Sequence, residues 1–550
     1  MRFYREVSNR VEDLSANRLH ILILVGSLLE IVWGEKMLNK LFYFAMVVLL
    51  VFLVSCSRSA QDEQTLVVGL EDAPKTLDPR YATDAYGMRI TQHLLFSTLV
   101  RYGYDLKIEP DLAQKWEMPD DKTYIFHLRK GVTFHDGTPL TARDVKFTIE
   151  HLLNKKTASP FASTYKGKIA RIRVMDDHTI QFVLTKPMAS FLTALIVPVL
   201  PRHLLEKGEF PAKMIGSGPF TLVAEKPNSI ELAAYENYFG GAPAVKRILF
   251  KIIQDNNTRF LKMKKGKLDL LINAIADKRI DDFKQEPLNA TYNVIEKPGI
   301  SYNYIAFNFE NQAVDNLTLR RAVAYAINVD EIIKHKVYGH AVKATGLLSP
   351  VNWYYEGDVV TYAHDPAKSI EILDTGGYAD PDGDGPQPRL TLEMKVSNNA
   401  SAVEVARILQ AQLGKVGIRL DIRPYEWGTF YGDIKSGNFQ MTSMRWVGVT
   451  EPDFYYDIFH SSQKPPMGRN RGRYSNEKLD SLLEQGRTEL DPQQRKTIYA
   501  DVQKIVALDV PYISLWHPNN VSIVHRRVKN YRQHPQGGFV SFRNLTLDDV

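Results

Sequence analysis

Residues 112–137 read LAQKWEMPDDKTYIFHLRKGVTFHDG. Within this stretch Tyr124, Phe126 and Leu128 occupy every second position. A period of two predicts a β-strand with one well-buried face, because successive side chains on a strand point to opposite sides. Residues 180–184, IQFVL, repeat the pattern and predict a second strand of the same kind.

Helical spacing is prominent further along the chain. Apolar residues from Leu319 to Ile327 recur at helical intervals, which predicts a helix that ends before Gly339. A second helix is predicted over Val405 to Leu413, ending near Gly417, and a strand-like alternation starts at Ile418. Helix, glycine and strand in this order form the α/β unit of a layered sheet domain. The predicted fold class is therefore mixed α/β.

Composition excludes several classes of protein. The chain has 550 residues, of which 24% are charged and 44% hydrophobic, so it is neither disordered nor a polytopic membrane protein. Its formal net charge is only +6 and no basic block occurs, which argues against a nucleic-acid partner. Its one cysteine excludes an intramolecular disulfide framework and a multi-cysteine metal site.

The N-terminal region has the pattern of a bacterial secretory signal. Leu41 to Val54 is an uncharged apolar run that is short for a membrane span; Lys40 precedes it, and Ser55 and Cys56 follow it. Residues 53–56, LVSC, resemble the lipobox of bacterial lipoproteins. That resemblance implies cleavage before Cys56 and lipidation of this cysteine. The alternative is a short buried helix that ends in an inert cysteine.

Two start sites are compatible with the residues before this run. A further apolar stretch, Leu19 to Gly34, is interrupted by Glu30. Either Met37 is the true start, or Met1 begins a longer membrane-associated leader. The short n-region of ordinary signals and the poor fit of Glu30 to a spanning helix favour Met37. We interpret residues 1–55 as a signal or leader region and residues 56–65 as a lipid-anchored tether.

Catalytic signatures are mostly absent from the sequence. It contains no P-loop, no dinucleotide-binding glycine motif, no nucleophile elbow and no zinc-protease helix motif. Gly216-Ser217-Gly218 lacks the elbow spacing and leads into Pro219. The prediction is that the protein is not an enzyme and has no cofactor.

Possible metal ligands are interpreted as structural residues. His127 and His135-Asp136 have no third ligand at a recognisable spacing. Residues 380–385, DPDGDG, imitate the opening of a calcium loop, but Thr391 stands where a bidentate glutamate is needed. Such residues also build solvated turns without an ion. We predict no metal site, and calcium binding at residues 380–385 stays an open question.

The stretch at residues 112–137 resembles the signature of family 5 extracellular solute-binding proteins. These proteins are the dipeptide, oligopeptide and nickel-chelate receptors of ABC importers. Further matches follow the family order along the chain, at Thr76–Pro79, Thr141–Val145, Gly216–Phe220, Gly266–Asp269 and Leu319–Ile327. The resemblance covers about residues 65 to 545, and its motifs are specific as an ordered set behind a lipobox.

The resemblance implies a periplasmic-binding-protein-like fold, in which two lobes joined by a hinge close on a ligand. A third domain is inserted in the first lobe. On this basis lobe I is expected to comprise residues 66–105, 186–301 and 512–545. The inserted domain is expected at residues 106–185, and lobe II at residues 302–511.

The resemblance also implies where the pocket lies. In peptide-binding members the segment after the Thr76–Pro79 motif lines it, which here means Thr83, Asp84, Ala85 and Tyr86. A tryptophan late in the second lobe forms another wall, and Trp446 matches it.

The usual partner of the ligand's α-amine is missing. Family members place an aspartate three residues after that tryptophan, and here Val449 stands there, with Glu451 one residue early for the next motif. A buried ammonium needs a charge partner, so either Glu451 or Asp84 substitutes, or the ligand has no free amine there. Arg469 and Arg471 are candidates for binding a ligand carboxylate, although a solvated basic loop is an equal alternative.

The expected function is that of an extracytoplasmic, lipid-anchored receptor in the periplasm or at the cell surface. It would capture peptides or a peptide-like solute and deliver them to ABC permease subunits, and it is expected to be a monomer without nucleic-acid partners. The alternatives are a hydrolase, for which no nucleophile and base are visible, and a surface lipoprotein that binds envelope or protein partners without import.

Overall fold

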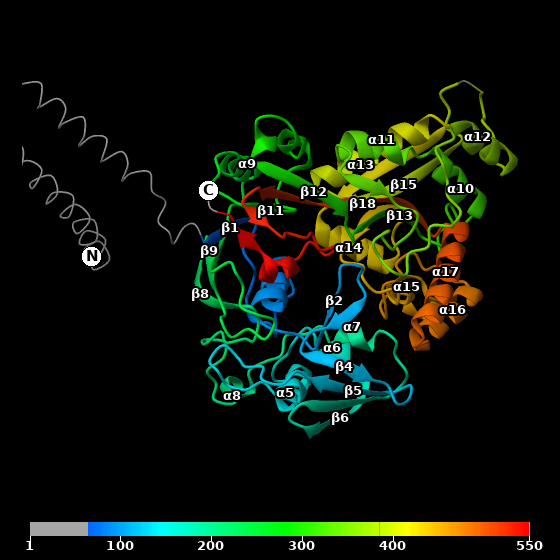
Figure 1. Ribbon diagram of the computed structural model, residues 1–550. Coiled ribbons are helices and arrows are strands. Elements are labelled where there is room, and N and C mark those ends of the chain that lie inside the picture. Colours follow the sequence, from blue (N-terminus) through cyan, green and yellow to red (C-terminus); the bar gives the residue numbers. More distant parts are fainter. Residues whose placement is uncertain (1–63, 384, 549–550) are drawn as a thin grey trace, which may run out of the picture. The chain divides into compact units, whose positions relative to one another are not determined.

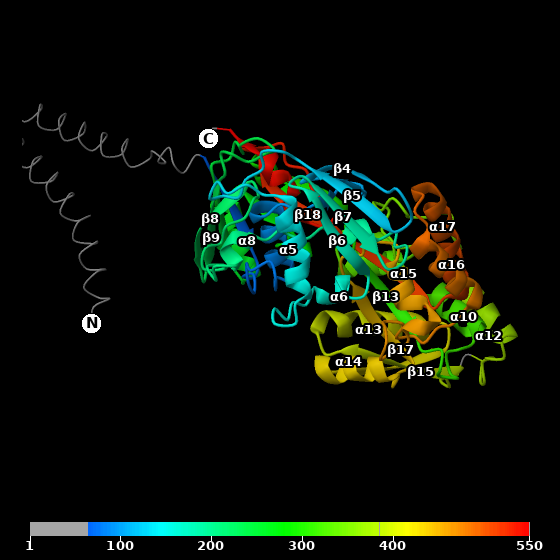
Figure 2. The ribbon, with the colours of Figure 1, turned by 90° about the horizontal axis from the view of Figure 1, so that it is seen from below.

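The stretch at residues 112–137 contains the first two strands of a four-stranded antiparallel sheet. In spatial order its strands are β4 (Ala113–Glu117), β5 (Thr123–Leu128), β7 (Thr179–Leu184) and β6 (Ile169–Asp176). Tyr124, Phe126 and Leu128 are buried, which confirms the strand expected from their alternation. The helix α5 (Ala142–Leu153) packs against β6 and β7 (Figure 2).

The computed structural model describes residues 64–383 and 385–548. Within them twelve strands form a mixed sheet. Ten follow one another in space as β16 (Ile418–Tyr425), β15 (Leu390–Ser397), β17 (Met441–Trp446), β13 (Tyr302–Phe307), β18 (Tyr512–His525), β11 (Leu270–Ile272), β1 (Thr65–Leu70), β10 (Arg247–Ile252), β9 (Ser229–Ala234) and β8 (Phe220–Lys226). The other two, β12 (Tyr292–Pro298) and β14 (Ala341–Lys343), pair with β18.

The long strand β18 belongs to both sides of this sheet. Its residues 512–516 pair with β13, and its residues 519–525 pair with β12. Figure 1 shows this red strand running from the side of β1 and β11 toward the side of β13 and β15. The chain passes between the two sides a second time at residues 299–301, directly between β12 and β13. We call the part of the sheet formed by β8, β9, β10, β1, β11 and β12 the β1 side, and the part formed by β13, β14, β15, β16 and β17 the β13 side.

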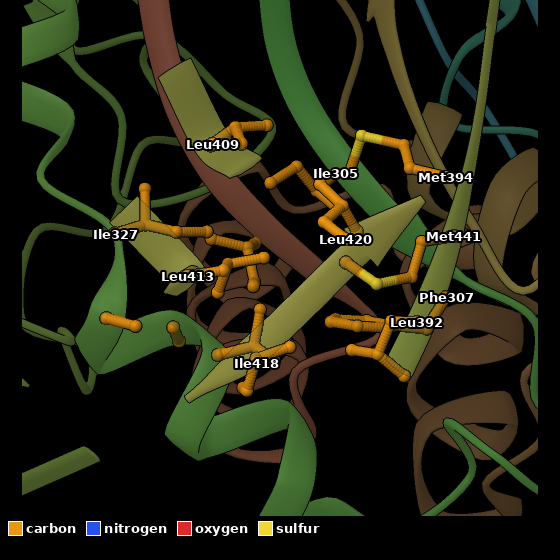
Figure 3. Packing of buried hydrophobic residues seen from close by; sticks show 14 of the residues in the cluster. Ile305, Phe307, Ile327, Leu392, Met394, Leu409, Leu413, Ile418, Leu420 and Met441 are labelled. Atoms are coloured by element: carbon orange, nitrogen blue, oxygen red, sulfur yellow. The ribbon is translucent and has the colours of Figure 1, made fainter. Parts of the chain in front are cut away.

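A parallel crossover builds the β13 side. The chain runs from β15 through α13 (Ala400–Gly414) into β16, which pairs with β15 in parallel. Helix and strand lie as their apolar spacing predicts, and Gly417 adopts the left-handed φ of +80° that the turn between them requires. Apolar side chains of β13, β15, β16 and α13 meet in one buried cluster that includes Ile305, Leu392, Leu409 and Leu420 (Figure 3).

The helix expected from Leu319 is in fact two helices. α10 (Leu317–Ala326) ends where Ile327 adopts an extended backbone, and α11 (Val329–Lys336) begins directly afterwards. Asn328 caps α11, because its side chain accepts a hydrogen bond from the backbone N–H of Glu331 at 2.9 Å. A local side-chain cap of this kind competes with continued helix, and apolar spacing alone does not reveal it.

The Gly216–Phe220 motif is a packing site. α4 (Ala85–Ile90) continues into a short π-helix, η1 (Thr91–Leu95), and the loop before β8 lies against its end. A Cβ atom on Gly216 would stand 1.9 Å from the carbonyl oxygen of Leu95, and one on Gly218 would stand 2.3 Å from that of Leu94. Glycine is required here because two backbones touch.

The remaining elements are connections and peripheral helices. They are β2 (Val100–Tyr102), β3 (Ile108–Pro110), α6 (Ala162–Tyr165), α7 (Phe191–Ala194), α8 (Arg202–Leu205), α9 (Asn256–Lys264), η2 (Asp277–Arg279), η3 (Asp281–Lys284), η4 (Leu288–Ala290), α12 (Pro366–Thr375), α14 (Trp427–Ser436), α15 (Phe454–Phe459), η5 (Ser461–Gln463), α16 (Glu477–Thr488), α17 (Pro492–Asp509), β19 (Val528–Lys529), η6 (Val540–Asn544) and β20 (Thr546–Leu547). Every helix in the described part of the chain is too short or too polar to cross a membrane. The expected signal region and Cys56 lie outside the described residues.

Candidate ligand-binding site

A cavity of about 530 Å³ lies where the two sides of the main sheet meet. Its floor is formed by residues 518–521 of β18 and by residues 299–301, the two segments that pass between the sides. One wall comes from the β1 side and the opposite wall from β13 and β17. The cavity is therefore lined by segments that are far apart in the sequence.

The first wall is a helical face that begins with α4. Asp84 caps this helix, because its carboxylate accepts the backbone N–H groups of Gly87 at 2.9 Å and Lys75 at 3.1 Å. Side chains at intervals of three or four residues lie on one face of a helix. The residues of this face that line the cavity are Ala85, Met88, Arg89 and Gln92.

Arg89 brings a positive charge to this wall. Its Nη2 donates to the backbone carbonyl of Gln536 at 2.9 Å. Among the described residues no carboxylate lies within 4.0 Å of its guanidinium group. Burial lowers the pKa of Arg89, and the charges of Tyr86 and Glu71 act in the opposite direction.

The opposite wall is one face of the β13–β17 pair. Asn303 of β13 stands directly opposite Arg445 of β17, and both line the cavity. Tyr302 and Trp446, the next pair along, are buried on the other face. Within residues 64–383 and 385–548 Arg445 has no carboxylate partner within 4.0 Å either.

The floor is held in place by a network of asparagine hydrogen bonds. The Nδ2 of Asn273 donates to the Oδ1 of Asn520 at 2.8 Å, and the Oδ1 of Asn273 accepts the backbone N–H of Val521 at 2.8 Å. Asn520 also donates to the carbonyl of Pro535 at 2.5 Å. These bonds fix the backbone at the point where β18 crosses between the sides, and they leave a polar surface under the cavity.

The family follows from a direct comparison. Residues 107–466 match the family described as bacterial extracellular solute-binding proteins, family 5 middle. The chain belongs to this family. Among curated proteins it is 28% identical to the dipeptide-binding protein of Escherichia coli (strain K12) over 518 residues, which are 88% of this chain and 95% of the relative. It is 27% identical to heme-binding protein A of Haemophilus influenzae over 522 residues, 89% of this chain and 93% of the relative.

Solved structures of family 5 proteins share the fold. HbpA2 from Haemophilus parasuis matches with a TM-score of 0.80 and 25% identity, over 88% of this chain and all of the other. The oligopeptide-binding protein AppA from Bacillus subtilis, solved with a nonapeptide, matches with a TM-score of 0.68 and 28% identity, over 88% of this chain and 99% of that one. The periplasmic-binding-protein fold expected from the motifs is thereby confirmed.

Of the expected pocket segment at residues 83–86, Ala85 is the residue that lines the cavity. Thr83 is exposed, and the carboxylate of Asp84 is engaged in capping α4. Tyr86 is buried on the far face of the helix, where burial and the charge of Glu71 raise its pKa to about 12.

Trp446 and Val449 lie behind the cavity wall. Both belong to a buried apolar cluster, in which the Trp446 ring stacks on Tyr304 with centroids 6.0 Å apart. The backbone N–H of Val449 donates to the carbonyl of Ile300 at 2.9 Å. Val449 therefore has a packing role here.

Glu451 is already neutralised by the protein. Its carboxylate forms an ion pair with Arg495, which is 4% exposed. Arg495 also donates to the carbonyl of Gly486 at 2.9 Å and to the Tyr354 hydroxyl at 3.1 Å. Burial opposes the charge of Arg495, but the Glu451 carboxylate outweighs it and raises the arginine's pKa.

Arg469 and Arg471 have different surroundings, and neither lines the cavity. Arg469 is exposed on a loop with its Nη1 3.9 Å from Asp457. Arg471 is 9% exposed, lies over the Trp446 ring at 4.4 Å and donates to the Tyr431 hydroxyl at 3.1 Å. The expected residues thus surround the cavity, and few of them touch it.

The cavity residues that sequence reasoning missed are near in sequence to residues that it named. Once Asp84 is taken as a helix cap, the interval of three or four from Ala85 selects Met88, Arg89 and Gln92. Once Trp446 is taken as buried in a strand, the alternation of strand side chains places Arg445 on the opposite face. Both signals are present in the sequence.

One group of side chains has the composition of a metal site. Ligand atoms of Asp281, Glu296 and His340 lie within 4.8 Å of one another. Lys284 already fills the space between the acids, with its Nζ 2.8 Å from Asp281 and 2.6 Å from Glu296. This ammonium supplies the positive charge that a metal ion would bring.

The other histidines and acids considered as ligands form internal contacts. His135 accepts the N–H of Gly216 at Nδ1 and contacts the carbonyl of Gly218 at Nε2, both at 3.1 Å, and burial lowers its pKa to about 4. His127 lies 3.1 Å from Glu117. In the loop at residues 380–385, Asp380 lies 3.5 Å from Arg389, and Asp384 is outside the described residues.

Proposed function

We propose that this protein is the lipid-anchored receptor of an ABC importer, which captures a peptide or a peptide-like solute and delivers it to the permease. One observation carries the proposal, namely the cavity of about 530 Å³ that is lined from both sides of β18. Its volume is typical of small-molecule sites. The names of its relatives support a peptide ligand, as does the Helicobacter pylori DppA structure with the peptide STSA, which is 26% identical with a TM-score of 0.69.

Capture would proceed by closure of two lobes. Lobe I is residues 66–105, 186–301 and 512–545, lobe II is residues 302–511, and residues 106–185 form the inserted domain. A ligand that touches both walls binds the closed form better and shifts the population toward it. Closure is supported by a contact between distant segments, since the Tyr102 hydroxyl lies 3.0 Å from the Thr450 hydroxyl. Capture and release require no chemical step.

The membrane attachment would come from Cys56 after cleavage of residues 1–55. Residues 56–65 would then connect the lipid to the first strand, which starts at Thr65. Metabolic labelling with a radioactive fatty acid tests this point. The wild-type protein should be labelled, and C56A should be unlabelled and released from the membrane fraction.

Uptake measurements test import itself. A deletion strain should lose uptake of the peptide that the purified protein binds, and a plasmid copy should restore it. Unchanged uptake in the deletion strain, together with tight binding in vitro, would instead favour a surface lipoprotein that holds its ligand without import.

A further inference from the structure

We infer that the solute is anionic, and that its acidic groups are bound by Arg89 and Arg445 from opposite walls of the cavity. The inference rests on the proposed function, because it takes the cavity to be the ligand site. It narrows the ligand from peptides in general to peptide-like solutes with more carboxylates than ammonium groups.

The two arginines are placed for this role by separate elements. Arg89 extends from α4 on the β1 side, and Arg445 extends from β17 on the β13 side. Neither has a carboxylate within 4.0 Å in the described part of the chain. Arg89 is half-buried, and a guanidinium group away from bulk water is stabilised by an anionic partner, whereas Arg445 is exposed to solvent. The planar donors of a guanidinium group bind carboxylates in pairs.

Negative charge is scarce in the same cavity. Among the described residues that line it, Asp277 is the only carboxylate. Burial raises the pKa of Asp277, and the negative charge of Glu296 raises it further. The charges of His340 and Lys336 lower it. A zwitterionic peptide would bring an ammonium group, for which the described cavity lining offers one carboxylate. An anionic solute finds two cations.

The acids that sequence reasoning offered as ammonium partners are used elsewhere. The Asp84 carboxylate caps α4, and the Glu451 carboxylate is paired with Arg495. Val449 has no charge and is packed in the core. Freeing Glu451 for a ligand would leave Arg495 buried and unpaired, which costs several kcal/mol. These three residues therefore have structural roles and supply no carboxylate to the described lining of the cavity.

A smaller adjoining cavity also has more arginines than carboxylates in its described lining. It has a volume of about 180 Å³ and shares Gln92, His93 and Gln536 with the main cavity. Arg101 and Arg543 line it, and its one carboxylate among the described residues, Asp111, lies 3.7 Å from Arg101. Burial raises the pKa of Asp111, and its carboxylate accepts the backbone N–H of Thr98 at 3.0 Å. Arg101 is also paired with Glu109 at 3.4 Å, so Arg543 is the arginine of this cavity that has no carboxylate within 4.0 Å among the described residues. An extended anionic solute would reach Arg543.

Three forms of one tripeptide test the inference on the purified full-length protein. They are N-succinyl-trialanine with two negative charges, trialanine as a zwitterion, and trialanine amide with one positive charge. Titration calorimetry should give the affinity order succinylated, zwitterionic, amide. We expect at least about tenfold between the first two, because one charge-assisted pair is worth a factor of this size.

Substitutions then locate the effect. R89Q and R445Q should each weaken binding of the succinylated peptide about tenfold and change trialanine binding less. D277N, which removes the opposing charge, should strengthen binding of the succinylated peptide. R171Q is the matched control, since Arg171 is exposed on β6 outside the cavity, and it should change neither affinity.

The outcomes separate this inference from the proposed function. Equal or reversed affinities for the succinylated and zwitterionic peptides would overturn the inference and leave a peptide receptor standing. Unchanged binding of the succinylated peptide by R89Q and R445Q would overturn the assignment of the two arginines. Binding of none of the three peptides would overturn both the inference and the peptide part of the proposed function.

Discussion

Two regions of the protein hold partly or fully buried arginines, and the regions differ in what surrounds the charge. In the layer behind the cavity, Arg495 of α17 pairs with Glu451 and has further hydrogen-bond acceptors. At the cavity wall, Arg89 has one backbone carbonyl at 2.9 Å. A satisfied buried charge indicates a structural role. A guanidinium without an anionic partner, directed at a cavity, indicates that the partner is a ligand.

The largest expected effect is the loss of stability when Arg495, whose charge is paired with Glu451, is replaced. R495M leaves the partly buried Glu451 without its partner, so the free energy of unfolding should fall by about 3 kcal/mol. Urea unfolding followed by circular dichroism measures it. R171M, at an exposed position, should change stability by less than about 0.5 kcal/mol. A loss below about 1 kcal/mol in R495M would show that the pair is not structural.

Histidines away from bulk water provide a second comparison. His135 makes both of its ring hydrogen bonds only while the imidazole is neutral. Its folded pKa of about 4 lies below the ordinary value of 6.5, so between these values the unfolded chain takes up a proton and the folded protein does not. Stability should therefore fall as the pH is lowered from 6.5 toward 4. Between pH 7 and pH 5 this residue should account for about 2 kcal/mol.

H135Q should remove that part of the pH dependence. The measurement is urea unfolding at pH 7 and pH 5 for wild type, H135Q and H335Q, since His335 is an exposed control of the same residue type. An H135Q protein that loses as much stability at pH 5 as the wild type would contradict the assignment. His517 and His534, whose pKa values burial also lowers to about 4, would account for the pH dependence that remains.

A smaller effect is expected where residues 66–105 of lobe I meet the β13 side. The Tyr102 and Thr450 hydroxyls are 3.0 Å apart, so Y102F and T450V should be coupled by about 1 kcal/mol in a double-mutant cycle of unfolding. Losing this contact should also populate open forms and increase the radius of gyration in solution scattering.

The matched pair for this test is Thr345 and Tyr355, whose hydroxyls are 3.1 Å apart within the β13 side. Y355F and T345V should show similar coupling in unfolding without any change in the radius of gyration. If both pairs change it equally, the Tyr102–Thr450 contact has no special part in closure.

The smallest effect on stability, and of opposite sign, is expected at Arg89. R89M removes a charge that has no carboxylate within 4.0 Å among the described residues, so stability should stay the same or rise by up to about 1 kcal/mol. The same urea measurement as for R495M applies. A loss of 3 kcal/mol or more would place Arg89 in the structural class with Arg495, and the contrast between the regions would fail.

Much of the fold follows from sequence, because each pattern concerns one local element. The alternation at Tyr124 to Leu128 and the glycine after α13 both gave elements that the structure contains. The break between α10 and α11 depends on one asparagine cap, which spacing does not encode. The family could be predicted because several of its motifs occur in order along the chain.

The site was harder to predict because it depends on which face a residue presents. Trp446 and Arg445 are neighbours in sequence and lie on opposite faces of β17. Glu451 looked available as an amine partner because its own partner, Arg495, is 44 residues away along the chain. Long-range pairs of this kind decide whether a charge is free, and one sequence does not show them.

Native mass spectrometry of the protein purified from its own membrane tests the central claim most directly. The bound solute is released by denaturation and identified by liquid chromatography and tandem mass spectrometry. The account predicts a peptide-like molecule of one or a few masses, with more carboxylates than ammonium groups at neutral pH. A broad set of ordinary zwitterionic or cationic peptides would contradict it.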